Sequence, residues 1–236
     1  MKICGLLKTT LLDYPGHVAC TIFTGGCNMR CPFCHNAELL DINLPSVYSE
    51  EDIFAFLDKR AGTLEGVAIT GGEPTLHRDL PDFIRKIRER YGLDVKLDSN
   101  GIHPEMLEQL IRDKMVDYVA MDIKACPERY AYVSGVTEEK LHFDRITRSK
   151  DLLLQGQVPY EFRTTVTGGL NTEEDFHGIA RFIEGADAYF LQCFKDSGNI
   201  VDKDRGFYEP SKEELLRYRD IVAPHVRRAE LRGIDY

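Results

Sequence analysis

CNMRCPFC, the octapeptide Cys27–Cys34, places three cysteines at the spacing C-x3-C-x2-C. Three thiolates are one fewer than the four that close a structural zinc site or fully ligate an iron–sulfur cluster. A [4Fe–4S] cluster held only by Cys27, Cys31 and Cys34 keeps one iron open to a further ligand. An open coordination position is typical of metal sites that do chemistry rather than only hold a fold. The spacing therefore indicates a metal site with an open coordination position in this loop.

Two other interpretations of the cysteines fit less well. A disulfide framework is typical of short, secreted, cysteine-dense chains, whereas this chain has 236 residues and seven cysteines. We expect no secretory signal, because the start of the chain leads directly into polar residues. A zinc ribbon would need a second close cysteine pair. The remaining cysteines are scattered, and we expect them to be small buried or half-buried hydrophobic residues: Cys4, Cys20, Cys126 and Cys193.

Length and charge narrow the class of protein further. A chain of 236 residues is long enough to bury a large core, and we expect one domain over residues 1–236. No apolar run approaches the length of a membrane span. The net charge of −9, with no cluster of Lys and Arg, argues against a nucleic-acid surface. Free thiols and an oxygen-sensitive cluster predict a reducing, cytoplasmic location.

Short β-branched runs alternate with longer amphipathic stretches along the whole chain. The predicted strands are Val18–Phe23, Gly66–Thr70, Asp94–Leu97, Tyr118–Ile123, Tyr160–Val166 and Ala188–Phe194. The predicted helices are Ser49–Lys59, Leu80–Tyr91, Pro104–Lys114, Asp144–Gln155, Thr172–Ile183 and Ser211–Pro224. Alternation of this kind predicts an α/β fold with a parallel sheet and right-handed crossovers. Six such units are two short of a closed eight-fold barrel.

Several of these helices begin at a recognisable signal. Ser49 is followed three residues later by Asp52, a capping box with Asp in place of Glu. Thr172 and Ser211 each precede two acidic residues, which suit the positive end of a helix dipole.

The distinctive polar motifs fall where the predicted strands end. The cysteine loop follows the first strand, and Gly71-Gly72-Glu73-Pro74 follows the second. In barrels the chemistry lies at the carboxyl ends of the strands. Two glycines after a strand often mark only a tight turn, but they also let backbone carbonyls approach a ligand. Glu73 either contacts that ligand or orders the turn.

Charged residues lie at the ends of the later strands. Asp122 and Lys124 are two residues apart, so on one strand they share a face. Two charges on an inward face are costly unless they are paired or used. A salt bridge at the rim is the structural interpretation, and ligand binding is the functional one. Arg163 and Asp98 leave the same two interpretations open, and the Asn100-Gly101 pair after Asp98 is typical of a turn.

The octapeptide resembles the signature of the radical S-adenosylmethionine (SAM) enzymes, in which the open iron chelates SAM. Phe33 is the aromatic residue usual between the second and third cysteines of that family. His35-Asn36 completes a Cys-His-Asn ending typical of the activases of glycyl-radical enzymes. The family's fold is a partial (β/α)6 barrel, which matches the count of six units.

Longer segments extend the resemblance over nearly the whole chain. Lys8–Gly16, Ile69–Leu76 and Asp117–Lys124 look like segments of the activating proteins of anaerobic ribonucleoside-triphosphate reductase. Ser99 stands where Thr is commoner, which is a small departure. No second cysteine set follows Cys34, unlike in activases that carry extra clusters.

The resemblance implies a role for each matching residue. Cys27, Cys31 and Cys34 hold the cluster, and Phe33, His35 and Asn36 lie beside it. The GGEP backbone receives the amino group of SAM. Asp122 and Lys124 contact the SAM ribose and carboxylate, Arg163 can reach the carboxylate, and Asp98 is a further candidate for the cofactor site.

The implied reaction is reductive cleavage of SAM to methionine and a 5′-deoxyadenosyl radical. That radical takes a hydrogen atom from a glycine of a partner enzyme, and the resemblance favours anaerobic ribonucleotide reductase as this partner. The implied electron donor is reduced flavodoxin or ferredoxin.

Other functions stay open at this point. One is activation of a different glycyl-radical enzyme. Another is a radical SAM enzyme that acts on a small molecule, as the 7-carboxy-7-deazaguanine synthases do, with residues that close the barrel mouth. The third class is an iron–sulfur electron carrier or a zinc-binding interaction module, which would have no affinity for SAM.

Overall fold

The computed structural model describes residues 1–196 and 198–234, and these divide into two compact units. The first unit contains Met1–Asn28, Glu38–Ala120 and Gln157–Pro159. The second contains Met29–Ala37, Met121–Gly156 and the chain from Tyr160 onward. The division falls inside the cysteine loop, so that Cys27 belongs to the first unit and Cys31 and Cys34 to the second.

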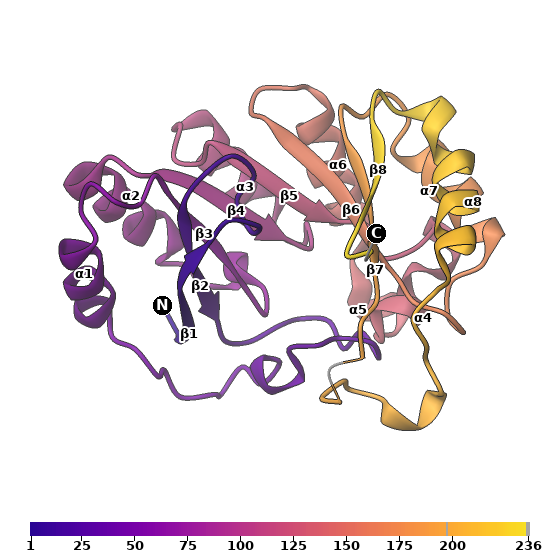
Figure 1. Cartoon of the computed structure of the whole chain (residues 1–236), viewed down its shortest axis with the longest axis horizontal. Helices are drawn as coiled ribbons and strands as arrows, with labels where there is room; N and C mark the ends of the chain where they lie inside the picture. Colours follow the sequence, from indigo (N-terminus) through magenta and orange to yellow (C-terminus); the bar gives the residue numbers. More distant parts are fainter. Residues whose placement is uncertain (197, 235–236) are drawn as a thin grey trace. The chain divides into compact units, whose positions relative to one another are not determined.

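The described residues form eight strands that follow one another in chain order in the sheet (Figure 1). They are β1 (Ile3–Thr10), β2 (Ala19–Thr24), β3 (Gly66–Gly71), β4 (Asp94–Ser99), β5 (Tyr118–Asp122), β6 (Tyr160–Val166), β7 (Tyr189–Cys193) and β8 (Ala229–Arg232). All six predicted strands are present as β2 to β7, and the strand order is that of a partial α/β barrel. The predicted fold class is confirmed.

Two strands were not predicted, and one of them departs from the parallel pattern. Strand β1 pairs with β2 in the antiparallel direction, whereas β2–β3, β3–β4, β6–β7 and β7–β8 are parallel pairs. Strand β8 ends the sheet beside β7. The barrel-like sheet therefore carries one extra strand at each end.

The helices connect the parallel strands as expected. They are α1 (Glu50–Lys59), α2 (Leu80–Tyr91), α3 (Pro104–Arg112), α4 (Tyr130–Ser134), α5 (Glu138–Leu141), α6 (Phe143–Leu154), α7 (Glu173–Phe182) and α8 (Lys212–Val222). Capping boxes begin α1 at Ser49, α7 at Thr172 and α8 at Ser211. The short helices α4 and α5 were not predicted.

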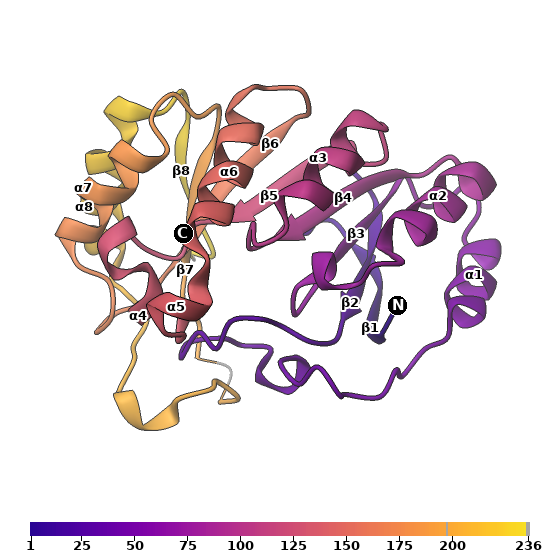
Figure 2. The ribbon, with the colours of Figure 1, turned by 180° about the vertical axis from the view of Figure 1, so that it is seen from behind.

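The core of the first unit lies between its strands and its helices. Helix α2 packs against α1 and β4 (Figure 2), and Ile84 and Ile87 on its inner face are fully buried. Gly92 ends α2 in the left-handed conformation, with φ of +63°, which an L-residue adopts only with strain. Val95 and Leu97 of β4 are buried beneath this helix layer.

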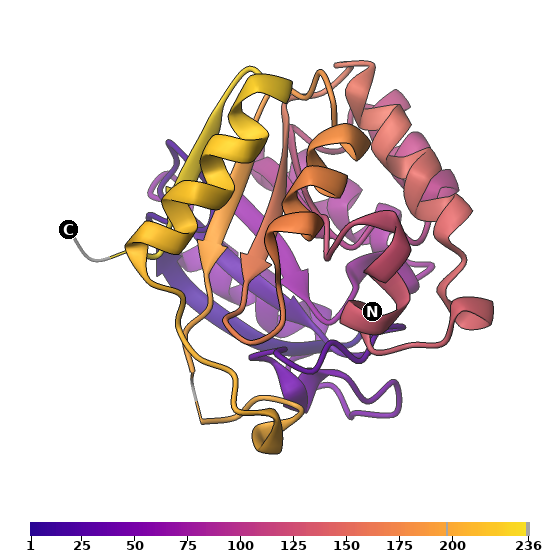
Figure 3. The same ribbon diagram turned by 90° about the vertical axis from the view of Figure 1, so that its right-hand side faces the viewer.

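The core of the second unit contains several buried aromatic residues among its aliphatic ones. Helices α7 and α8 lie side by side (Figure 3), and the rings of Phe176 and Tyr218 stack between them with centroids 4.3 Å apart. Phe162 of β6 and Tyr189 of β7 are fully buried.

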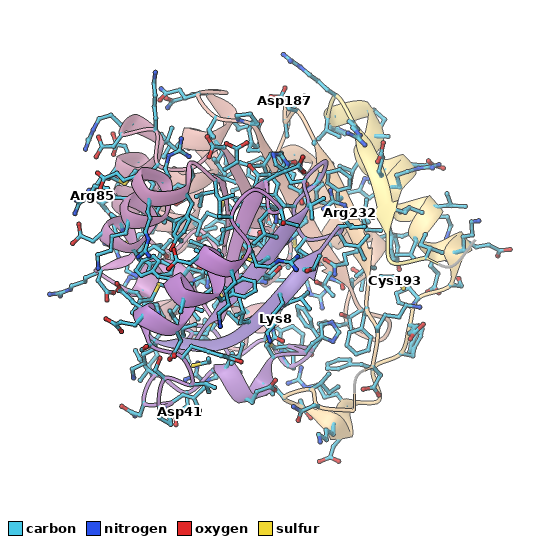
Figure 4. The ribbon with its side chains drawn as sticks, turned by 60° about the vertical axis from the view of Figure 1, so that its left-hand side comes forward. Lys8, Asp41, Arg85, Asp187, Cys193 and Arg232 are labelled. Carbon is cyan, nitrogen blue, oxygen red and sulfur yellow. The ribbon has the colours of Figure 1, made fainter. Side chains whose placement is uncertain are left out.

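A part-buried ion pair joins strands β6 and β8. Arg232, labelled in Figure 4, donates two hydrogen bonds to the fully buried carboxylate of Glu161, at 2.5 and 2.7 Å. Its guanidinium also lies 3.4 Å from the ring centroid of Phe190 on β7. These contacts hold β8, the last strand of the sheet, against β7 and β6.

None of the helices in residues 1–196 and 198–234 is long and apolar enough to span a lipid bilayer.

Candidate functional site

The Gly-Gly turn after β3 packs directly on the chain that leads into the cysteines. A Cβ on Gly71, where φ is +120°, would lie 2.3 Å from the backbone nitrogen of Thr24. A Cβ on Gly72 would lie 2.1 Å from the carbonyl oxygen of Gly26. The Gly72 N–H donates to the Thr24 carbonyl at 2.9 Å, and the Glu73 N–H donates to the Gly26 carbonyl at 2.8 Å. The glycines are therefore needed for close approach of two backbone segments.

The carboxylate of Glu73 is buried and fully engaged within the first unit. It accepts hydrogen bonds from the backbone N–H and hydroxyl of Thr75, the hydroxyl of Ser99 and the backbone N–H of Asn100. Only 1% of the residue is exposed, and burial raises the pKa of its carboxyl although the four donors oppose this shift. Of the two roles considered for Glu73, the geometry favours ordering of the turn.

Asn100 contacts the cysteine loop itself, which sequence reasoning missed. Its side-chain amide donates to Oδ1 of Asn28 at 2.9 Å and points to Sγ of Cys27 at 3.9 Å. The sequence predicts a turn at the Asn100-Gly101 pair. The structure confirms the turn, since Gly101 has a φ of +81°. The only signal in the sequence was its position at the carboxyl end of a strand.

Asp98 at the end of β4 pairs with a lysine that sequence reasoning also missed. Lys96 donates to Asp98 from the same face of the strand, and the two side chains are 3% and 12% exposed. The predicted strand contained Lys96, but nothing in the sequence indicated that this charge is buried.

The second half of the cysteine loop is anchored within the second unit. The Arg30 N–H donates to the carbonyl of Ser134 at 2.9 Å, and a Cβ on Gly135 would lie 2.0 Å from the Arg30 carbonyl oxygen. Cys31 and Phe33 are buried. Burial raises the pKa of the Cys31 thiol to about 11, while the nearby Lys124 cation opposes the shift. Cys34 is partly exposed, and its N–H donates to the Cys31 carbonyl at 3.0 Å.

His35 and Asn36 follow directly on this loop. The His35 ring stacks on the buried ring of Phe194, with centroids 5.3 Å apart and an interplanar angle of 20°. Burial lowers the pKa of His35, with Asp196 opposing the shift. Asn36 lies half-buried in the turn after His35. The contact to Phe194 places the end of the cysteine loop against the residue that follows β7.

Asp122, Lys124 and Arg163 form one network in the second unit. Lys124 donates from Nζ to Oδ2 of Asp122 at 2.8 Å, and Arg163 donates from Nε to Oδ1 of the same carboxylate. The three side chains are between 16% and 24% exposed. Burial would raise the pKa of Asp122, but Arg163 and Lys124 more than offset it and hold that pKa well below its usual range.

The network also shows how β5 and β6 place these charges. β5 ends at Asp122, so Lys124 lies just beyond the strand rather than within it. Tyr130 donates from its hydroxyl to the Asp122 backbone carbonyl at 3.2 Å and is fully buried. Burial would lower the pKa of Lys124, but Asp122, the largest opposing charge, raises it above its ordinary value. One carboxylate between two cations leaves a net positive charge, which suits an anionic ligand group.

The donor set of the cysteine loop fits an iron–sulfur cluster. Cys27, Cys31 and Cys34 take part in no disulfide, and Gly72 leaves no room for a side chain beside Gly26 at the start of the loop. No three His, Cys, Asp or Glu side chains in the described ranges form a group that would hold a single metal ion. The cysteines of such a cluster would each bind a different iron, so they need not converge on one point as the ligands of a single ion do. The scattered cysteines are buried, apart from the partly exposed Cys4.

The comparisons with known proteins identify the family of this chain. The family model of the radical SAM superfamily matches residues 21–183. A Methanocaldococcus jannaschii protein, provisionally named as a glycyl-radical enzyme activating enzyme, is 30% identical over 99% of this chain and 96% of its own length. The pyruvate formate-lyase-activating enzyme of Listeria monocytogenes is 32% identical over 50% of this chain and 52% of its own.

A solved structure supports the fold. A radical SAM methyltransferase from Sphaerobacter thermophilus superposes with a TM-score of 0.70 over 93% of this chain and 68% of that one, at 16% identity. The match of the family model covers more than half of the chain, and therefore the chain belongs to the radical SAM superfamily. It is an enzyme of the radical SAM type, and the cofactors of this family are a [4Fe–4S] cluster and SAM.

Proposed function

We propose that this enzyme activates a glycyl-radical enzyme, with anaerobic ribonucleoside-triphosphate reductase as the partner. The observation that carries the proposal is the 30% identity to the Methanocaldococcus jannaschii protein, which runs over 99% of the chain. A match of this extent includes the regions outside the cluster loop that distinguish one radical SAM enzyme from another. In this proposal residues 1–236 act as one radical SAM domain in the cytoplasm.

The cluster ligands in this proposal are Cys27, Cys31 and Cys34. When bound, the cluster and SAM supply a one-electron cleavage of the C5′–S bond, which yields methionine and a 5′-deoxyadenosyl radical. Phe33 and His35 keep the loop packed, because Phe33 is buried and the His35 ring stacks on Phe194. Asn36 lies in the turn that follows, beside this packed segment.

The SAM contacts come from two groups of residues. The backbone of Gly71, Gly72 and Pro74 receives the methionine amine, and Glu73 holds that turn in shape through its four hydrogen-bond donors. Lys124 and Arg163 bind the methionine carboxylate, because together with Asp122 they carry one net positive charge. Asp122 also accepts from a ribose hydroxyl, and Asp98 is a further carboxylate for the cofactor.

The second reactant is a glycine of the partner protein. Bound SAM would supply the radical chemistry that removes one hydrogen atom from the glycine Cα, which would leave a glycyl radical on the partner and 5′-deoxyadenosine. Reduced flavodoxin or ferredoxin supplies the electron for SAM cleavage. Segments Lys8–Gly16 and Asp117–Lys124 support the reductase as the partner, because they resemble those of its activating proteins.

Electron paramagnetic resonance tests the proposed function. An anaerobic mixture of this protein, SAM, a reductant and the candidate reductase should develop a glycyl doublet, with 5′-deoxyadenosine formed alongside. Cys31→Ala should give neither product, since the cluster is lost.

A second candidate is chemistry on a small molecule. A GTP 3′,8-cyclase of Pyrococcus abyssi, named as probable, is 26% identical over 64% of this chain and 48% of its own length. If the reductase and other glycyl-radical enzymes give no doublet, while a nucleotide drives 5′-deoxyadenosine formation, this second function replaces the first.

A further inference from the structure

The side chain of Asn100 joins the end of β4 to the first cysteine of the loop. Its Nδ2 atom lies 2.9 Å from Oδ1 of Asn28 and 3.9 Å from Sγ of Cys27. An amide nitrogen carries two hydrogens, so it can serve both acceptors at once. One of these acceptors is a proposed ligand of the cluster.

The orientation of this amide is fixed by its other end. The backbone N–H of Ile102 donates to Oδ1 of Asn100 at 3.1 Å. Since a backbone N–H can only donate, the oxygen of the amide must be the atom that faces it, and the nitrogen must face the cysteine loop.

The backbone of Asn100 is held as firmly as its side chain. Its N–H donates to Oε2 of Glu73 at 2.6 Å, and the neighbouring Ser99 hydroxyl donates to Oε1 of Glu73 at 2.9 Å. Glu73 and Asn100 are 1% and 5% exposed, so solvent competes little for these groups. A continuous chain of hydrogen bonds thus runs from Glu73 through Asn100 to Cys27.

We infer that Asn100 is a positioning residue that raises the reduction potential of the cluster by donating a hydrogen bond to the Cys27 thiolate. Reduction adds one negative charge, part of which resides on the sulfur ligands, and a fixed donor stabilises the reduced state more than the oxidised state. Hydrogen bonds to the sulfurs are among the factors that set cluster potentials. The inference rests on the proposed role of Cys27 as a cluster ligand.

Two substitutions of similar size test whether the N–H donor of Asn100 or only the shape of its side chain affects the reduction potential. Asn100→Leu removes both N–H groups, and Asn100→Asp puts a second acceptor oxygen where the nitrogen was. The reduction potential is measured on the cluster-loaded full chain, without SAM or partner, by potentiometric titration monitored through the electron paramagnetic resonance of the reduced cluster. We expect a more negative potential for Asn100→Leu and a larger negative shift for Asn100→Asp. Asn43→Asp, which makes the same charge change at an exposed residue, should leave the potential unchanged.

Asn28→Ala separates the hydrogen bond to sulfur from general disturbance of the loop. This substitution removes the other acceptor of Asn100 but leaves its N–H groups in place, so the potential should stay near that of the unsubstituted protein. Equal shifts in Asn28→Ala and Asn100→Leu would overturn the inference, because loop distortion would then be the cause. Unchanged potentials in both Asn100 variants, or folded variants that load no iron, would overturn it as well. Failure of the unsubstituted protein to load iron would instead contradict the proposed cluster.

Discussion

Glu73 accepts a hydrogen bond from the backbone N–H of Asn100, at 2.6 Å and 27 residues further along the chain. The bond ties the loop after β3 to the loop after β4, and both loops of the first unit carry residues proposed to contact SAM or the cysteine loop. Because the carboxylate of Glu73 accepts only internal hydrogen bonds among those of the described residues, we expect it to hold these loops in one arrangement.

Glu73→Gln should therefore destabilise the protein even without any cofactor. One carboxylate oxygen becomes an NH2 group that faces N–H and O–H donors, and an unsatisfied buried donor costs about 1–3 kcal/mol. The free energy of unfolding of the cofactor-free protein, from urea denaturation, measures this loss. The exposed Glu89 on α2 provides the control, since Glu89→Gln should change stability by less than about 0.5 kcal/mol. Equal stability of both variants would show that the Glu73 bonds do not order the turn.

Asp122→Asn should lower stability by about 2–3 kcal/mol at neutral pH, because it leaves two partly buried cations without their shared anion. The folded-state pKa of Asp122 lies below its ordinary value, so its contribution is present above about pH 4 and is lost as pH falls through the folded pKa. The difference in unfolding free energy between Asp122→Asn and the unsubstituted protein should hence shrink on acidification. A difference that stays constant down to about pH 3 would contradict this linkage.

Lys124→Ala should weaken SAM binding while leaving the iron content intact. The substitution removes one of the two cations proposed for the methionine carboxylate, and a loss of about 1.4 kcal/mol corresponds to tenfold in affinity. Isothermal titration of SAM into the cluster-loaded protein measures the change. Lys86→Ala is the matched control, because Lys86 is also ion-paired, to Glu50, but is 52% exposed on α2. If Lys124→Ala binds SAM with normal affinity, Lys124 forms only a structural ion pair with Asp122 and does not bind SAM.

Gly72→Ala should prevent cluster loading. The added Cβ would meet the Gly26 carbonyl oxygen at 2.1 Å, so the backbone before Cys27 has to move. Iron content after anaerobic reconstitution is the readout. Gly92→Ala serves as the control, because Gly92 has a φ of +63° but open space around it. We expect that control to lose about 1–2 kcal/mol of stability and to bind iron normally, and equal iron loss in both variants would point to general misfolding.

The alternation of strands and helices predicted much of this fold, and the misses have physical reasons. Helix α2 has the predicted bounds because its apolar spacing, its Pro81 at the start and its Gly92 at the end all agree. Strand β8 was missed because it is short, half of its residues are charged, and it is held in place by the Arg232–Glu161 pair. Strand β1 carries Gly5 and exposed polar residues, which hid its pairing with β2.

The candidate site, like the fold, could be predicted from the sequence only in part. The spacing of Asp122 and Lys124 predicted that they share a face, and they form an ion pair. That Arg163 completes their network depends on the placement of β6 beside β5, which no local pattern reports. The contact of Asn100 with Cys27 likewise depends on where two loops meet, so only the folded chain reveals it.

The contact between the GGEP turn and the start of the cysteine loop is made by backbone atoms on both sides. Such a contact is indifferent to the identity of most side chains around it. The Gly72 N–H bonds to the backbone carbonyl of Thr24 and not to its side chain, whereas a Cβ on Gly71 or Gly72 would lie 2.3 or 2.1 Å from the facing backbone. The contact between the GGEP turn and the cysteine loop can therefore be kept while the surrounding side chains change to suit different reaction partners.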